Sequence, residues 1–376
     1  MSWFTVFFSF FLIPFLGGNH LSLFYITIDK FWIETTFIMF LLFSILLEYV
    51  RKKQKGDLKE GKIDLGVFFL FFMPFFLINV SSIFWTWGIL STLNELNVLV
   101  WVLATVYLFY ITDRKEAALK AITLGAAVLG ICAMIQLKVL FPKLIETLKG
   151  GRYADIASIQ AIPFASFLYH NVFGGYMSFI LPLTLYFGIY KKKLLFQIAS
   201  IFIIAGIALS TSRIAMGISF LFLIGFISFL VKTKSIKNIL ILLLIVAMAI
   251  SVVFILIKTA THGEFKGLTA ELIKKSKPVP SEIRTLNTRT EIWKNAFRAF
   301  IAHPVAGVGP GATELAYRRY FDGGIYTRYT HSVLLKILVE LGIIGFICFL
   351  FYITGFIYLS WKKLKDYPYL FIFTSA

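Results

Sequence analysis

The feature that most constrains the fold is a series of apolar runs, most of them about as long as a membrane-spanning helix. A hydrocarbon core of about 30 Å needs about 20 apolar residues per helix. No soluble core could bury this much apolar surface, since 59% of the residues are hydrophobic and only 15% are charged. The runs therefore predict an all-α integral membrane protein, a polytopic bundle of about 10 to 12 transmembrane helices. Ten runs qualify, near residues 2–16, 31–50, 64–87, 94–111, 118–141, 171–190, 194–210, 213–231, 238–257 and 333–360.

We expect one polytopic membrane domain over residues 1–376. Residues 194–231 would span about 57 Å as one helix, so this block is predicted to be a hairpin that turns at residues 210–213. An eleventh run begins near Tyr367 and has only ten residues, about half a crossing, so the chain is expected to be truncated there or to end in a re-entrant stub. The predicted parts are spans 1 to 5 in 1–141, spans 6 to 9 in 142–257, a long loop in 258–331, and span 10 with the start of span 11 in 332–376.

Basic residues predict the orientation. Five short loops rich in Lys and Arg, of which residues 51–62 hold six, fall on one side in the ten-span count. By the positive-inside rule that side, with the N-terminus, is cytoplasmic. The long loop then lies outside, yet it carries 12 Lys and Arg against 6 Asp and Glu, a net charge of +6. This excess is typical either of a solvated loop or of a site for an anionic partner.

The long loop contains a predicted amphipathic helix. Asn287 is its expected capping residue, Glu291 falls in its first turn, and apolar residues follow at 292, 293, 296, 297 and 300. Arg289, four residues before Trp293, lies at the end of this apolar stripe. A guanidinium beside the positive end of a helix indicates an anion there. The alternative is an arginine that packs on Trp293 and extends its charge into water.

Two further residues on the predicted outer side could carry chemistry. Arg213 opens a span there, and its planar guanidinium is suited to phosphate, although interfacial arginines commonly contact lipid headgroups. His331 ends the long loop, and a neutral imidazole can accept a proton near pH 7. A lone interfacial histidine is more often structural. The two cysteines, Cys132 and Cys348, lie in apolar runs without ligand-spaced partners, which argues against a disulfide framework or a zinc site.

The remaining candidates flank these residues. Residues 303–311 hold too many turn formers for a helix and are predicted to form a compact corner, and residues 312–321 a short helix that bears Tyr317, Arg318 and Arg319. The corner is not a nucleotide loop, because no Lys-Ser/Thr follows it. His170 and Asn171 lie at the outer end of the sixth span. Lys336 and Glu340, four residues apart inside the tenth span, either neutralise each other or serve function.

Taken in order, these motifs resemble the O-antigen ligase and polymerase superfamily. His331-Ser332, nine residues and Gly342-x-x-Gly345 are similar to its His-(Asn/Ser/Gln)-x9-Gly-x-x-Gly signature. Arg289-x3-Trp293 with the glycines of residues 304–311 is similar to its Arg-x3-Trp and Gly-x-Gly-x-Gly motifs. Ser212-Arg213 resembles its Ser-Arg helix start, and residues 170–176 resemble its Asn-containing span.

The resemblance implies a GT-C-like bundle in the bacterial inner membrane with a long helical periplasmic loop, acting as a metal-independent, inverting glycosyltransferase without a cofactor. The donor would be a glycan on undecaprenyl diphosphate, and the acceptor lipid A core or a second glycan; no nucleic acid is involved. Arg213 and Arg289 would hold the diphosphate and His331 would act as general base. The residues expected to bind substrate are Asn171, His170, Arg152, Tyr317, Arg318, Arg319 and Glu340.

Alternatives stay open at this point. The acceptor, and with it the choice between ligase, polymerase and protein glycosylation, is not decided by these motifs. A polytopic transporter with a basic outer vestibule would also have ten or more spans, but it predicts broken helices and ionisable residues near the midplane, and often inverted repeats. Lys336 and Glu340 are the only such pair, and no repeat is visible.

Overall fold

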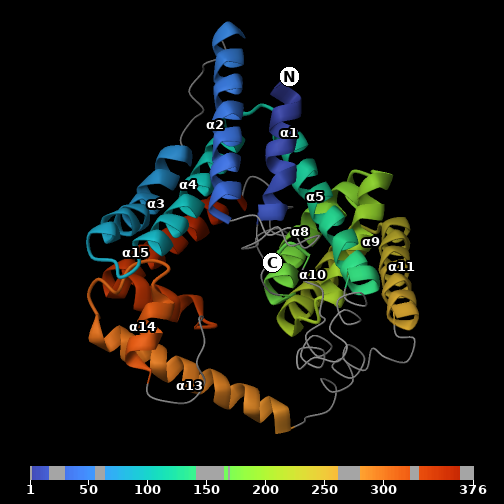
Figure 1. Ribbon diagram of the computed structural model, residues 1–376. Coiled ribbons are helices and arrows are strands. Elements are labelled where there is room, and N and C mark those ends of the chain that lie inside the picture. The colour runs from blue at the N-terminus through green and yellow to red at the C-terminus, as the bar shows by residue number, and fades with distance from the viewer. Residues whose placement is uncertain are drawn as a thin grey trace. The chain divides into compact units, whose positions relative to one another are not determined.

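The computed structural model describes residues 2–16, 30–55, 64–140, 165–167, 170–260, 280–321 and 330–364 (Figure 1). Helices dominate these ranges, and no β-strand occurs within them. The chain divides into two compact units. The first consists of residues 1–48, 112–277 and 367–376, and the second of residues 49–111 and 278–366.

The first unit is a helical bundle built from the apolar runs near the N-terminus and in the middle of the chain. Small residues let its helices approach closely: a Cβ added at Gly174 on α8 would lie 2.4 Å from the Ser210 Oγ that follows α9. Ser178 Oγ donates to the Ala215 carbonyl on α10 at 3.0 Å and lies 2.9 Å from Ser219 Oγ. These contacts fix the start of α8 against the α9–α10 turn. The helices are α1 (Ser2–Leu12), most of α2 (Lys30–Lys55), α5 (Lys115–Ile135), α8 (His170–Leu185), α9 (Leu194–Leu209), α10 (Arg213–Lys232) and α11 (Ile236–Ala260), with a short 3-10 segment (Ile13–Leu16) and two π segments (Gln136–Leu140 and Tyr186–Tyr190).

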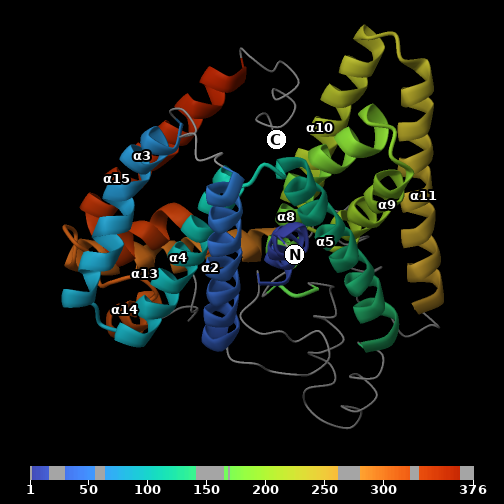
Figure 2. The same cartoon turned by 90° about the horizontal axis from the view of Figure 1, so that it is seen from above.

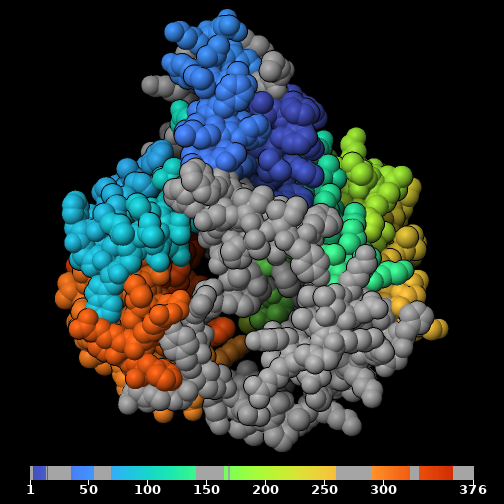
Figure 3. Space-filling view, in the orientation of Figure 1, coloured from blue at the N-terminus to red at the C-terminus, as the bar shows by residue number. Residues whose placement is uncertain are grey.

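The second unit contains the later part of the predicted long loop, from residue 278 onward. In Figures 1 and 2 alike, α3 runs alongside α15, and aromatic rings join them: the ring centroids of Phe71 and Phe351 are 4.6 Å apart, and those of Phe75 and Phe349 are 5.7 Å apart. The atoms of α13 and α14 form a continuous surface with those of α3 and α4 in the space-filling view (Figure 3). The helices are α3 (Asp64–Ser81), α4 (Ile89–Ile111), α13 (Pro280–Ala302), α14 (Thr313–Tyr320) and α15 (Val333–Leu364), with a 3-10 turn (Ser82–Phe84) after α3.

The predicted all-helical membrane architecture is confirmed in its main feature. A helix occupies each of the ten apolar runs, and the predicted break at residues 210–213 is confirmed, because α9 ends at Leu209 and α10 begins at Arg213. Within the described residues six helices are long and apolar enough to cross a membrane; the count of ten to twelve crossings and their orientation stay predictions. The six are Ile89–Ile111, Lys115–Leu140, His170–Tyr190, Arg213–Lys232, Ile236–Thr259 and Val333–Tyr358, and shorter apolar helices occur at Trp3–Leu12, Phe69–Phe84 and Leu194–Leu209.

Within the long loop one prediction is wrong. The helix that carries Arg289 begins at Pro280, so Asn287 lies inside α13 and is not its capping residue. Proline is well suited to the first position of a helix, since its fixed φ is helical and its missing N–H would have no helical partner there. Arg289 therefore lies well away from the positive end of the helix, so the helix dipole does not favour an anion beside it. The predicted short helix over residues 312–321 is confirmed as α14.

Candidate functional site

The last described helix, α15, is broken at Gly342. This residue has φ 63° and ψ −163°, a conformation that only glycine adopts readily. A break in a helix leaves backbone N–H and C=O groups on both sides without helical partners. Residues 304–311, here called the glycine loop, satisfy them. Four backbone hydrogen bonds join the two segments: Val308 N–H to Val339 O (3.0 Å), Gly309 N–H to Glu340 O (2.8 Å), Ile343 N–H to Pro304 O (2.8 Å) and Ile344 N–H to Val305 O (3.3 Å).

The glycines of the two signature motifs are needed for this close backbone contact. A Cβ at Gly307 would lie 2.4 Å from the Glu340 carbonyl, and a Cβ at Gly342 would lie 2.3 Å from the Val305 carbonyl. Gly309 would meet Thr86 Oγ1 at 2.1 Å. All three residues also have positive φ, which other residues rarely adopt. The spacing of the motif glycines therefore permits direct backbone contact between the glycine loop and α15. We call the four hydrogen bonds between these two segments the glycine lock.

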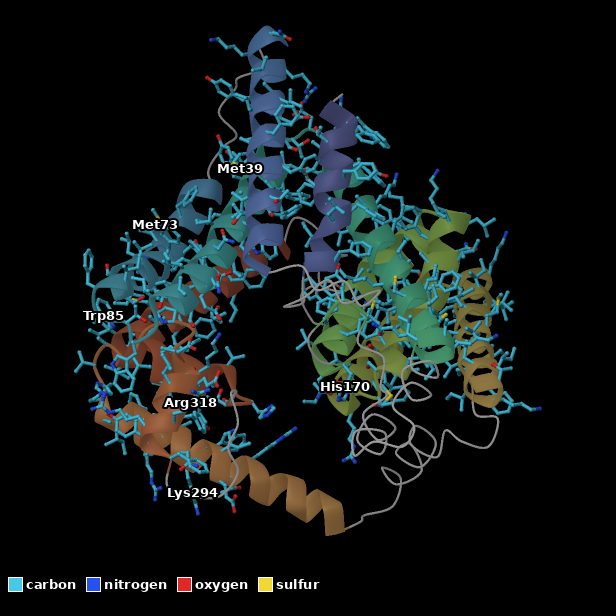
Figure 4. All side chains as sticks on the ribbon, in the orientation of Figure 1. Met39, Met73, Trp85, His170, Lys294 and Arg318 are labelled. Carbon is cyan, nitrogen blue, oxygen red and sulfur yellow. The ribbon has the colours of Figure 1, made fainter. Side chains whose placement is uncertain are left out.

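The turn between α3 and α4 holds the other side of the glycine loop. Trp87 N–H donates to the Val308 carbonyl at 2.9 Å, and the Trp85 indole N–H donates to the Ala306 carbonyl at 3.0 Å. Trp85 is labelled beside the loop in Figure 4. Sequence reasoning missed these contacts, because tryptophans at the end of an apolar run are ordinary interface residues and give no sign of a partner more than 200 residues away.

Helix α13 is anchored to the loop and to α14 through one face. Ile292 and Ala296 are buried there with Tyr317 of α14, in a cluster that also includes Val308 and Val339. Tyr317 is fully buried, and its hydroxyl donates to the Ile292 carbonyl. Burial raises the pKa of Tyr317 to about 12. These contacts give Tyr317 a structural role, and its predicted contact with substrate has no support in them.

The same anchoring brings Arg289 and His331 together. The Trp293 indole N–H, one turn after Arg289, donates to the carbonyl of Thr330 at 3.0 Å and so holds the residue next to His331. His331 has φ +52° and precedes Ser332, whose Oγ caps α15 by accepting from the Leu335 N–H at 3.4 Å.

The surroundings of His331 favour its neutral form. Partial burial lowers the pKa of His331, and the positive charge of Arg289 lowers it further. A histidine with a pKa below its usual 6.5 is neutral at pH 7 and can accept a proton. Both side chains are exposed, so a ligand can reach them.

The predicted pair of Lys336 and Glu340 is present, with Lys336 Nζ 3.8 Å from Glu340 Oε2. Lys336 Nζ also lies 2.9 Å from Glu95 Oε1 on α4, a closer partner that sequence reasoning missed. Glu340 is buried and accepts a hydrogen bond from Thr313 Oγ1 at 2.6 Å. The position of Glu95 early in an apolar run is a sign that its carboxylate has a partner, but nothing in the sequence indicates which residue that partner is.

The two arginines of α14 have partners of their own. Arg318 is exposed and forms an ion pair with Glu314 one turn earlier, at 2.7 Å (Figure 4). The Arg319 guanidinium lies 5.1 Å from the centroid of the Trp87 ring. Both arginines remain accessible to an anion, whereas Glu340 is bonded inside the unit.

A second group of predicted residues meets in the first unit. His170, at the start of α8 (Figure 4), lies with Nδ1 2.7 Å from the Ser210 carbonyl. Arg213 begins α10 after Ser212, whose side chain accepts from the Ala215 N–H. Asn171 follows His170 and is exposed. The α9–α10 turn thus gathers three predicted residues, while Arg152 lies outside the described residues.

These features define an integral membrane protein with an exposed histidine and arginine held beside a glycine lock. Within the described part of the chain no group of three or more His, Cys, Asp and Glu residues could hold a metal ion. Residues 198–350 match the family model described as O-antigen ligase, which confirms the resemblance to the O-antigen ligase and polymerase superfamily. The match supports a membrane glycan enzyme of this type, and the matched stretch contains Arg213, Arg289, the glycine loop and His331. No curated protein and no solved structure matches the chain.

Proposed function

We propose that this protein is a glycosyltransferase that moves a glycan from undecaprenyl diphosphate to an acceptor hydroxyl on the outer face of the bacterial inner membrane. One observation carries the proposal: the Trp293 indole N–H, one turn after Arg289, donates to the carbonyl of Thr330, the residue before His331, at 3.0 Å and so holds the segments of the arginine and the histidine together. A neutral base beside a fixed cation is what transfer from a diphosphate leaving group requires.

In the proposed reaction the acceptor oxygen attacks the anomeric carbon of the donor glycan from the face opposite the diphosphate. The hydroxyl proton passes to the neutral imidazole of His331. The bond between the anomeric carbon and the diphosphate oxygen breaks, and undecaprenyl diphosphate leaves with its bonding electrons. Arg289 stabilises the negative charge that develops on the leaving group, because its planar guanidinium binds two phosphate oxygens at once. The attack inverts the anomeric configuration.

Other residues enter the proposal in lesser roles. Arg213 is proposed, from the resemblance, as a second residue that binds the donor diphosphate. His170, Asn171, Arg318 and Arg319 are proposed as substrate contacts, with lipid A core or a second glycan as the acceptor.

The test uses the purified chain with an undecaprenyl-diphosphate glycan and both acceptors in competition. His331→Ala and Arg289→Ala are expected to abolish transfer while the protein stays in the membrane. Lys294→Ala is the matched control, because Lys294 is an exposed basic residue on the same helix, on the side away from α14 (Figure 4), and should leave transfer unchanged. Wild-type turnover in both alanine variants would contradict the assignment, and the acceptor consumed identifies the branch of the superfamily.

A further inference from the structure

Helix α13 carries a second apolar stripe that stays partly exposed among the described residues. Trp293, Phe297 and Ile301 recur every fourth residue and therefore lie on one face of the helix. The exposed fractions of these side chains are 42%, 50% and 59%, unlike those of Ile292 and Ala296, which are buried on the neighbouring face. Large side chains exposed in a row mark an interaction surface.

The stripe has a basic group at one end. Arg289 lies four residues before Trp293, on the same face, and it is exposed. From Arg289 to Ile301 the helix rises about 18 Å at 1.5 Å per residue. A ligand lying along this face would therefore meet a cation at one end and three large apolar side chains beyond it.

The other end of the stripe leads to the membrane segment. Val305, exposed at 58%, follows α13 and accepts a backbone hydrogen bond from Ile344, which is itself exposed. Residues 342–361 form a run of 20 residues without a single Asp, Glu, Lys or Arg, the length of one crossing. Lys336 and Glu340 precede this run. The apolar path from Trp293 thus reaches α15 where its uncharged segment begins.

We propose that this stripe is the track for the hydrocarbon chain of the lipid-linked donor. The chain leaves the bilayer at Ile343 and Ile344, passes Val305, Ile301 and Phe297, and presents its diphosphate at Arg289. An amphiphile with an anionic head and a long apolar tail complements a cation followed by such a stripe. This inference rests on the proposed function and assigns it a binding surface for the lipid.

The experiment compares two donors that carry the same glycan diphosphate, one on undecaprenol and one on the short geranyl chain. The wild type is expected to show a lower KM for the undecaprenyl donor. Phe297→Gln with Ile301→Gln should raise that KM about tenfold, leave the KM for the geranyl donor unchanged and leave kcat unchanged for both. Phe84→Gln is the matched control, because Phe84 is 91% exposed in the same unit but lies off the stripe.

Each of the following outcomes would contradict the proposal that the stripe binds the lipid tail. A wild type without preference between the donors, or a double variant that keeps the wild-type ratio of the two KM values, means that the tail binds elsewhere. An equal rise of both KM values means that the stripe only lies on the bilayer. A wild type that transfers glycan from neither donor overturns the proposed function, and the track with it.

Discussion

Replacing Gly342 by alanine is expected to open the lock between α15 and the glycine loop. The new Cβ would lie 2.3 Å from the Val305 carbonyl oxygen and 2.4 Å from its carbon, which are backbone atoms and cannot rotate away. The φ of 63° and ψ of −163° would add strain of their own, because residues with a side chain rarely occupy that region.

The expected loss of stability follows from these contacts. Backbone strain in such a region costs about 1–3 kcal/mol. The N–H groups of Ile343 and Ile344 would each lose a hydrogen bond to the glycine loop, worth about 0.5–1.5 kcal/mol apiece. Together these losses amount to about 4 kcal/mol. The strain and the steric clash are relieved most easily if the glycine loop separates from α15. Because α13 ends just before this loop, Arg289 would then move relative to His331.

Two measurements on purified protein check this prediction. Thermal unfolding should show a Tm lowered by roughly 10 °C, and kcat/KM for glycan transfer should fall about a hundredfold, since a displacement of about 1 Å in a site can cost that much. The control is Gly225→Ala on α10, where an added Cβ meets nothing within 4 Å. If the Gly342 and Gly225 variants have the same Tm and the same kcat/KM, the lock does not position the site.

Two further predictions concern single side chains. The value of kcat/KM should fall as the pH is lowered below 6.5, because His331 accepts a proton only when neutral and its pKa is lowered. Arg289→Gln removes one cause of that lowering, so an NMR titration of this variant should show a higher His331 pKa. An unchanged or lower pKa would contradict the proximity of Arg289 to His331. Tyr317→Phe leaves the buried Ile292 carbonyl without its side-chain donor and should cost about 1–3 kcal/mol of stability. The KM for the donor should not change in the Tyr317→Phe variant. A changed KM with an unchanged Tm would instead indicate that Tyr317 contacts the substrate.

The residues that sequence reasoning placed well are those whose signals are local. The break between α9 and α10 follows from the length of an apolar block that no single crossing could accommodate, and α14 follows from the turn formers before it. The predicted helix start at Asn287 is wrong for a local reason too, because a residue that caps helices well can also lie inside a longer helix. The spacing of four residues predicts the ion pair of Lys336 with Glu340, which is present at 3.8 Å, but it gives no sign of the closer partner, Glu95, which is 241 residues distant.

The sequence by itself determined that this is a helical membrane protein and which motifs resemble a glycan-transferring family, because hydropathy, helical periodicity and motif spacing are properties of short segments. Only the tertiary structure decided what the glycines do. Their spacing says nothing of the bonds between Pro304 and Ile343 or between Gly309 and Glu340, which close a break in one helix with the backbone of a distant loop. The Trp293–Thr330 hydrogen bond likewise joins the segments of Arg289 and His331, since contacts across the fold, and not local preference, fix where two side chains from different segments meet.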